Sequence, residues 1–249
     1  QSALFGQSCF SENQSKCTYG TGAFFLINTG HKKINSQNGL LTTIAYRAEG
    51  KTFYALEGSS YIAGAAVQWL RDNLNIIETA AEVESLAIKS SEEKMKNVMF
   101  LPFFTGLASP YWVADAQAAI VGLTRDTGKP EIARACLEGI TMAIEDLLDS
   151  VRKDIGSGPK ELRVDGGATL NSFLLQTQAN FSKTNIVRPK VIETTAYGAA
   201  LAAAVGAKHI GIEDISELWE SDKVFEPQIS NYYYDKKTKW NTLIEKLYL

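Results

Sequence analysis

Two short glycine-containing segments have residues that could hold a phosphate group through their backbone. Thr18-Tyr-Gly-Thr-Gly22 lies between two strand-like runs, and Asp165-Gly-Gly-Ala168 lies between a strand-like run and a helical run. Glycine lets the main chain come close to an anion, and a hydroxyl group or a helix N-terminus adds donors and a favourable dipole. Taken alone, each segment is better explained as an ordinary hairpin turn or a tight corner between strand and helix. The occurrence of both segments in one chain favours a phosphate site more than either segment does alone.

The remaining reactive residues give little support to other chemistries. The P-loop pattern Gly-x-x-x-x-Gly-Lys-Ser/Thr does not occur, so a phosphate site would lack that lysine and rely on backbone donors and Mg²⁺. His31 and His209 are too isolated for a zinc site or a hydrolase triad. Cys9, Cys17 and Cys136 form an odd, irregular set that favours a reducing compartment, and Cys136 has the spacing of a buried thiol.

Composition predicts a folded, cytoplasmic protein. The 249 residues are 45% hydrophobic and 21% charged, with a formal net charge of −3. No dense run of Lys and Arg suggests a nucleic-acid partner, and no apolar run reaches the roughly 18 residues of a membrane span. The first residue is Gln and not Met, and the first seven residues look like the middle of a secondary-structure element. We therefore expect processing or truncation upstream.

The elements that must position the two turns follow from periodicity and turn residues. Alternating apolar residues predict strands at 23–28, 41–46 and 52–56, followed by helices at 62–74 and 77–88 and a buried strand at 98–101. Pro130 suits the first turn of a long helix whose apolar stripe continues to Val151.

The last third repeats a strand–loop–helix unit. Strands are predicted at 161–165 and 184–188, and helices at 171–180 and 195–205. Such alternation requires parallel strands with right-handed crossovers. The chain is therefore predicted to be one α/β domain, with a mixed five-stranded sheet flanked by helices. A final helix at 232–249 could pack on this domain or meet a partner.

Several longer blocks occur in a distinctive order: Leu4-Phe-Gly-Gln7, Thr18-Tyr-Gly-Thr-Gly-Ala-Phe24, Asn38-Gly-Leu-Leu-Thr-Thr-Ile-Ala45, Gln68-Trp-Leu-Arg-Asp72, Phe104-Thr-Gly-Leu-Ala-Ser-Pro-Tyr-Trp112, Ile120-Val-Gly-Leu-Thr-Arg125, Arg163-Val-Asp-Gly-Gly-Ala168 and Thr195-Ala-Tyr-Gly-Ala-Ala200. From residue 1 to about 229 the chain resembles the C-terminal domain of the FGGY carbohydrate kinases, and within them the glycerol kinases. The resemblance implies the ribonuclease H-like ATPase fold shared with actin and Hsp70. It also implies ATP-dependent phosphorylation of glycerol to glycerol 3-phosphate with Mg²⁺.

The same resemblance implies a set of ligand-binding positions. They are Thr21 and Gly22 at the terminal phosphates, Gly64 and Gln68 at the ribose and phosphate side, Gly167 at the α-phosphate, Asn171 at the adenine and Phe24 at the carbon backbone of glycerol. An asparagine amide has a donor and an acceptor that suit an adenine edge, although Asn171 could simply cap a helix. Phe24 could equally be an ordinary core residue.

One departure from the resembled family concerns its catalytic base. In that family the base is an aspartate just upstream of the Leu-Phe-Gly-Gln block, and this chain begins after it. Residues 1–249 are therefore expected to be the C-terminal nucleotide-binding domain alone, without the N-terminal substrate domain. We assign no catalytic or metal-binding residue, and expect Asp165 to order its turn or a metal-bound water. Expected partners are ATP, glycerol and the missing domain, with a homo-oligomer at full length.

Three alternatives remain open from the sequence. A kinase of the same family could act on another sugar or polyol, since most substrate contacts are expected in the missing half. A non-catalytic actin-like module could use ATP only to set the angle between domains. A nuclease-like member of the fold would need a cluster of carboxylates around two metals, and the sequence offers no such cluster.

Overall fold

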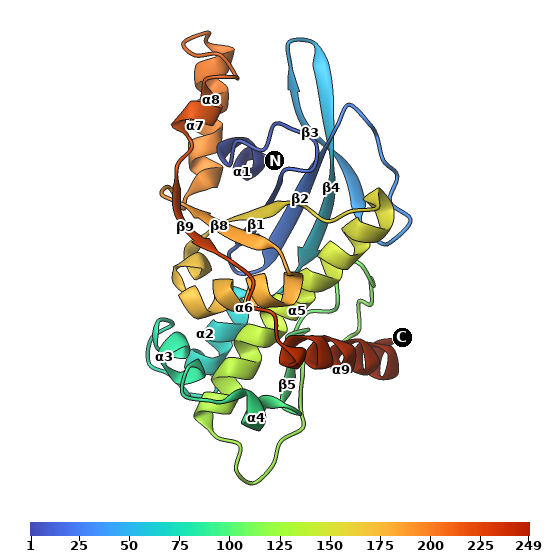
Figure 1. Cartoon of the computed structure of the whole chain (residues 1–249), viewed down its shortest axis with the longest axis vertical. Coiled ribbons are helices and arrows are strands. Elements are labelled where there is room, and N and C mark those ends of the chain that lie inside the picture. Colours follow the sequence, from blue (N-terminus) through green and yellow to red (C-terminus); the bar gives the residue numbers. More distant parts are fainter.

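The computed structural model describes residues 1–249 and contains one large mixed sheet (Figure 1). Its seven strands lie in the order β3-β4-β2-β1-β7-β8-β9. Their bounds are β1 Ser15–Tyr19, β2 Ala23–Gly30, β3 Leu41–Ala48, β4 Lys51–Ser60, β7 Glu161–Asp165, β8 Asn185–Pro189 and β9 Ser221–Phe225. Strands β1 to β4 pair antiparallel, while β7 runs parallel to both β1 and β8. The predicted change from hairpins to parallel crossover units is confirmed.

The predicted count of five strands is too low. Strand β1 is the first arm of the hairpin that carries residues 18–22, and it joins the sheet as its central strand. Strand β9 adds an antiparallel edge beside β8, but only Phe225 of its residues is buried. An edge strand held by main-chain pairing needs little apolar alternation, so periodicity gave no signal for it.

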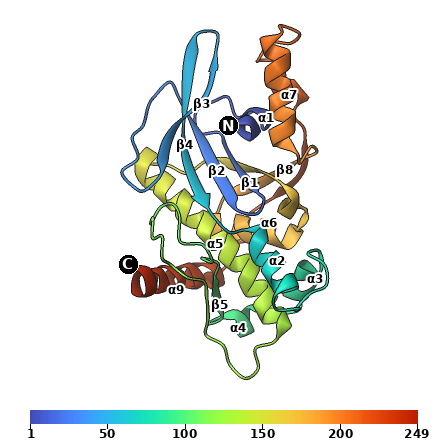
Figure 2. The same cartoon turned by 180° about the vertical axis from the view of Figure 1, so that it is seen from behind.

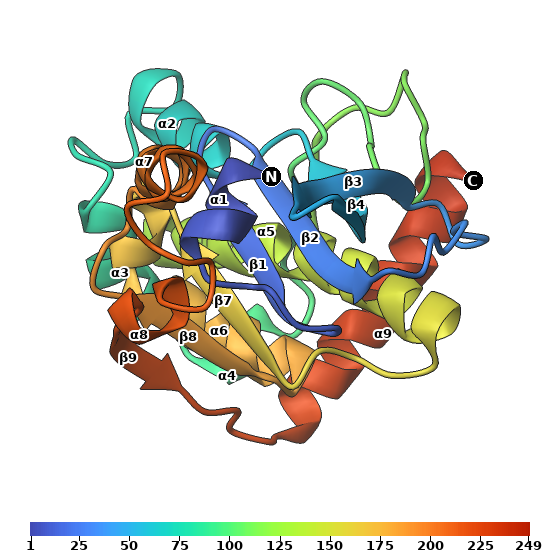
Figure 3. The ribbon, with the colours of Figure 1, turned by 90° about the horizontal axis from the view of Figure 1, so that it is seen from above.

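Helices cover both faces of the sheet. Helix α5 (Lys129–Ile155) crosses one face together with α2 (Gly64–Asp72) and α6 (Ser172–Ser182). Helices α1 (Ser2–Gly6) and α7 (Thr194–Gly206) contact each other on the opposite face, as Figures 1 and 3 show. The main core lies between sheet and α5, where Phe25 and Leu56 pack in one cluster with Ile144 and Leu147. The predicted long helix is confirmed, and Gly156, with φ of 85°, ends it.

Most predicted helices are present with shifted ends. The predicted helix at 77–88 is reduced to α3 (Glu82–Ala87), because residues 78 and 79 instead donate hydrogen bonds to the Glu82 carboxylate and form its N-terminal turn. The predicted strand at 98–101 is β5 (Met99–Leu101), but it pairs with β6 (Ala119–Val121) in a separate small sheet. The short helices are α4 (Glu92–Met95), α8 (Ile215–Leu218) and the 3₁₀ turn η1 (Gly167–Leu170).

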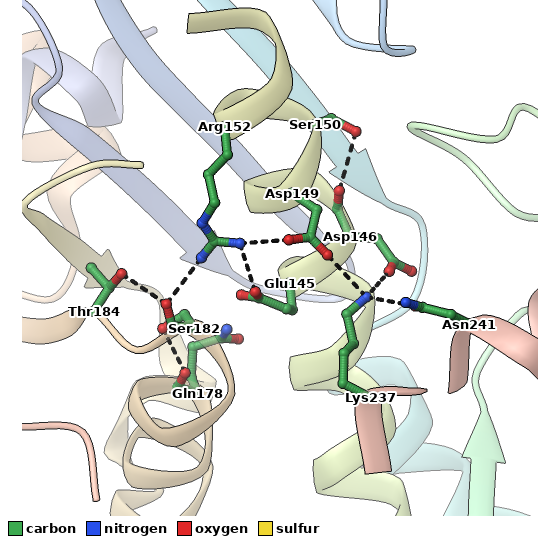
Figure 4. Close-up of polar contacts among 10 residues, drawn as sticks. All are labelled: Glu145, Asp146, Asp149, Ser150, Arg152, Gln178, Ser182, Thr184, Lys237 and Asn241. Atoms are coloured by element: carbon green, nitrogen blue, oxygen red, sulfur yellow. Dashed lines mark hydrogen bonds and ion pairs between the residues drawn. The ribbon is translucent and has the colours of Figure 1, made fainter. Parts of the chain in front are cut away.

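The final helix, α9 (Asn231–Tyr248), packs on its own chain, as one of the two alternatives for it required. Its Trp240 is fully buried and donates a hydrogen bond of 2.8 Å to Asp146 of α5. Lys237 of α9 also pairs with Asp146 and lies 3.4 Å from Asp149. Arg152 joins Asp149 and Glu145 to the Ser182 carbonyl at the end of α6 (Figure 4). This ionic network ties α5, α6 and α9 together.

None of the helices combines the length and the apolar composition that a membrane crossing demands.

Candidate nucleotide-binding site

A pocket of about 420 Å³ opens where the β1–β2 hairpin meets α2, α3, α5 and the start of α6. Figure 2 shows the hairpin reaching toward these helices. Apolar side chains of α2, α3, α5 and α6 form part of its lining: Val67, Val83, Leu137, Ile140 and Leu174. The lining also includes glycines and polar residues from the hairpin, α2, α3 and the start of α6. A mainly apolar lining with a few polar groups suits a ligand that has a flat apolar ring and a polar tail.

The hairpin tip and helix α2 form one structural unit at the first end of the pocket. The backbone N–H of Gly64 donates to the Gly20 carbonyl at 2.9 Å, and that of Ala63 donates to the Thr21 carbonyl at 2.8 Å. A Cβ atom on Gly64 would lie 2.7 Å from the Gly20 oxygen, so only glycine permits this approach. These contacts place Thr21, Gly64 and Gln68 together along the pocket wall.

The second turn contains two adjacent glycines, Gly166 and Gly167, whose surroundings differ. Gly166 has φ of 90°, and a Cβ atom there would lie 2.6 Å from the Tyr19 carbonyl oxygen. This glycine is required by the fold, because it packs against β1. Gly167 has no neighbouring atom within 4 Å of a Cβ position, and it lines the pocket. The protein itself therefore leaves open space at Gly167, where the backbone could approach a ligand.

The start of α6 forms the far end of the pocket. Asn171 is the N-cap residue of α6, and its Oδ1 accepts a hydrogen bond of 2.8 Å from the backbone N–H of Leu174. Glu84 of α3 accepts a second bond of 3.0 Å from the backbone N–H of Phe173. Both side chains line the pocket. Asn171 is thus the helix cap that was one of the two predictions for it, and it also lines the pocket.

Of the seven predicted ligand-binding positions, five line this pocket and two do not. The five are Thr21, Gly64, Gln68, Gly167 and Asn171. Gly22 is absent from the lining, and a Cβ atom on it would lie 2.7 Å from the Ser60 carbonyl oxygen. Phe24 lies on β2 outside the pocket with 45% of its surface exposed, which is not the position of an ordinary core residue.

Sequence reasoning missed Arg71 and Glu84 as pocket residues. Arg71 belongs to the segment Gln68-Trp-Leu-Arg-Asp72 and follows Gln68 by nearly one helical turn, so its spacing signals the same helix face. Glu84 lies in a short helix without a recognisable motif, and only its contact with α6 brings it to the pocket.

A buried pair of opposite charges lies on the other side of the hairpin. The ammonium group of Lys16 donates to Thr18 Oγ1 at 2.9 Å and to the Phe24 carbonyl at 3.0 Å. Burial lowers the pKa of Lys16 and raises the pKa of Asp165, while their mutual attraction opposes both shifts. Asp165 also accepts a hydrogen bond of 2.9 Å from Gln7 and is almost fully buried. These contacts favour a role for Asp165 in ordering its turn.

Comparison with curated proteins gives relatives that are about twice as long as this chain. The glycerol kinase of Rhodopirellula baltica is 49% identical over 248 residues, which cover 99% of this chain and 46% of the relative. The glycerol kinase of Deinococcus radiodurans is 49% identical over 233 residues, which cover 92% of this chain and 46% of the relative. The chain thus spans about half the length of these relatives.

Solved structures share the fold over the whole chain. Plasmodium falciparum glycerol kinase with ADP superposes with a TM-score of 0.90 at 38% identity, covering 100% of this chain and 50% of that one. Xylulose kinase from Lactobacillus acidophilus superposes with a TM-score of 0.86 at 23% identity, covering 99% of this chain and 50% of that one. The sugar-kinase form of the predicted α/β fold is confirmed. Residues 15–207 match the family model described as the FGGY family of carbohydrate kinases, C-terminal domain, and the chain therefore belongs to that family.

Proposed function

We propose that the pocket binds ATP and that this chain supplies the nucleotide-binding wall of a glycerol kinase. The observation that carries the proposal is the convergence of two turns that are distant in sequence. Thr21 of the first and Gly167 of the second line the same pocket, together with Asn171 at its far end. The relatives that are 49% identical to this chain are glycerol kinases, which supports glycerol as the acceptor.

In this proposal the base lies against the apolar part of the lining and the phosphates extend toward the glycine turns. Asn171 would contact the base, Gln68 the ribose side and Gly167 the α-phosphate. The hydroxyl of Thr21 and the amide of Gly22 would stabilise charge on the transferring phosphoryl group, although Gly22 requires the phosphates to pass beyond the lining of the pocket. Phe24, on the exposed sheet surface, would contact the carbon backbone of glycerol.

Metal ligands are not part of this assignment. No group of three or more His, Cys, Asp or Glu side chains is placed to hold a metal ion. Asp165 is engaged with Gln7 and buried, so it does not fit a direct metal ligand. We therefore expect Mg²⁺ to enter with the nucleotide, on the phosphate oxygens.

We also propose that residues 1–249 form a C-terminal nucleotide-binding domain that works with a second, N-terminal domain. The relatives are about twice the length of this chain, which leaves room for such a domain. The second domain would contribute the other wall of the cleft, the remaining glycerol contacts and the general base. Phosphoryl transfer needs the acceptor held in line with the γ-phosphate and shielded from water, and one wall cannot do either.

Two measurements test these proposals separately. Calorimetry should detect binding of ADP to residues 1–249. The Thr21→Val substitution keeps the size of the side chain but removes the hydroxyl group, so it should lower the affinity for ATP more than the affinity for adenosine. A coupled assay for glycerol 3-phosphate should detect turnover by the intact gene product but none by residues 1–249. Absence of nucleotide binding would contradict the pocket assignment. Turnover by residues 1–249 alone would contradict the need for a second wall.

A further inference from the structure

Two side chains at the far end of the pocket are held in fixed orientations by the first turn of α6. Glu84 Oε1 accepts from the Phe173 amide at 3.0 Å, and Asn171 Oδ1 accepts from the Leu174 amide at 2.8 Å. The N-terminal amides of a helix have no partners within the helix, so these two oxygens satisfy them. A carboxylate at a helix N-terminus is also favoured by the helix dipole. Both orientations are thus set by α6.

The second polar atom of each side chain has no hydrogen-bond partner in the protein. Because Asn171 uses its oxygen for the cap, its Nδ2 group is the atom left over, and that group can only donate. Glu84 Oε2 is likewise free, and as a carboxylate oxygen it can only accept. Both residues line the pocket. The pocket lining therefore includes one residue with a free acceptor and one with a free donor, and the caps fix which atom of each side chain is free.

We propose that Glu84 is the residue that selects adenine over guanine, an inference that rests on the proposed nucleotide site. Adenine carries a donor, its N6 amino group, next to an acceptor, N7, whereas guanine carries two acceptors, O6 and N7, on the same edge. A carboxylate acceptor and an amide donor complement the adenine edge. Guanine would set its O6 against the Glu84 carboxylate, which repels it and leaves it unpaired. Asn171 can serve N7 of either purine, so discrimination falls to Glu84.

The alternative is that Glu84 only caps α6, and Glu84→Gln separates the two roles. The glutamine oxygen can still accept from Phe173, and its amide nitrogen then replaces the free carboxylate oxygen with a donor. Selection by Glu84 predicts that the ratio of the GDP to the ADP dissociation constant falls about tenfold or more, through tighter GDP and weaker ADP binding. A cap alone predicts an unchanged ratio. The intact gene product is titrated with ADP and with GDP by calorimetry.

Two further variants make the result specific. Glu82→Gln removes a carboxylate from the same helix that also accepts a backbone amide but does not line the pocket, and it should leave the ratio unchanged. Asn171→Asp keeps the oxygen that caps α6 but replaces the free donor by an acceptor, so it should lower the affinities for ADP and for GDP to a similar extent. This variant shows whether the base reaches α6 even if Glu84→Gln folds poorly.

The outcomes distinguish this inference from the function on which it rests. A wild-type protein that binds neither nucleotide refutes the nucleotide site, and the role of Glu84 with it. Wild-type binding of ADP with a ratio that Glu84→Gln leaves unaltered, at an unchanged melting temperature, overturns the selection role alone. A ratio that falls in Glu84→Gln and stays constant in Glu82→Gln supports it.

Discussion

At the scale of single residues, three glycines that line the pocket or its second turn differ in what surrounds them. Gly64 and Gly166 lie against backbone carbonyl oxygens, whereas Gly167 faces open space in the pocket. The sequence alone does not distinguish the surroundings of these three glycines. Their surroundings divide them into glycines that the fold requires and one that only a ligand would require.

The Gly167→Ala variant should therefore fold normally and bind nucleotide poorly. A methyl group there meets no protein atom, so the free energy of unfolding should change by less than about 1 kcal/mol. ADP affinity should fall at least about tenfold, because the methyl group would occupy the path of the phosphates. Gly206→Ala, which also adds a methyl group in open space but on α7, is the matched control. If the Gly167→Ala protein binds ADP with unchanged affinity, the phosphates do not lie against this turn.

Gly64→Ala, in contrast, should lose stability as well as ADP affinity. Its methyl group would lie 2.7 Å from the Gly20 oxygen, so the hairpin tip and α2 must separate. We expect a loss of about 1–3 kcal/mol of stability, measured by chemical denaturation. ADP affinity should fall as well, since the same contact places Thr21. A fully stable Gly64→Ala protein would mean that the hairpin and α2 are not one unit.

At the scale of elements, the ionic network between α5, α6 and α9 contains a carboxyl group, that of Glu145, whose charged form is disfavoured by burial. Glu145 pairs with Arg152 through Oε1 at 2.7 Å, but its buried Oε2 has no partner (Figure 4). Burial raises the pKa of Glu145 to about 7, against the opposing charges of Arg152 and Lys237. Nearby Asp149 adds to the rise. The charged form is therefore costly in the folded state at neutral pH.

The consequence is a stability that depends on pH through Glu145. A carboxyl whose pKa is raised on folding contributes stability below its ordinary pKa near 4.5, and this stability is lost as the pH rises through about 7. Glu145→Gln should thus be more stable than the wild type at pH 8, by roughly 1–3 kcal/mol, and lose this advantage at pH 5. Urea denaturation at both pH values measures it. Glu93→Gln, which removes an exposed carboxylate, is the control, and a Glu145→Gln protein destabilised at pH 8 would refute the argument.

At the scale of the whole molecule, the sheet has one partly open face. Phe24 and Leu41 are about half exposed on it, while α1 and α7 cover the neighbouring strands. Exposed apolar side chains on a sheet face are typical of a surface that meets a ligand or another domain. This position agrees with the proposed glycerol contact of Phe24 and with a second domain opposite.

Phe24→Ala is the corresponding test in the intact gene product. Because the ring is outside the nucleotide pocket, ADP affinity should be unchanged. The KM for glycerol should rise roughly tenfold, since the ring would no longer pack against the carbon chain. Leu41→Ala, which truncates another exposed side chain of this face, controls for a general effect on domain contact. A larger change in the KM for ATP than for glycerol would place Phe24 elsewhere in the mechanism.

The sequence by itself determined the change from hairpin strands to strand–loop–helix units, the mixed sheet and the two glycine turns, because these depend on local periodicity and turn residues. The resemblance carried by longer sequence blocks also singled out Thr21, Gly64, Gln68, Gly167 and Asn171, which line one pocket. These features are local in the chain, or are carried by blocks long enough to be specific.

Three features became visible only in the tertiary structure. They are the pairing of β9 at the sheet edge, the position of Gly22 outside the pocket lining, and the contact of Glu84 with the start of α6 next to Asn171. Each depends on main-chain pairing or close approach between segments far apart in the chain. A strand that pairs at an edge needs no pattern, and a carboxylate that reaches a helix from another element has no fixed spacing to it. These contacts form only when the chain folds, and no local sequence pattern predicts them.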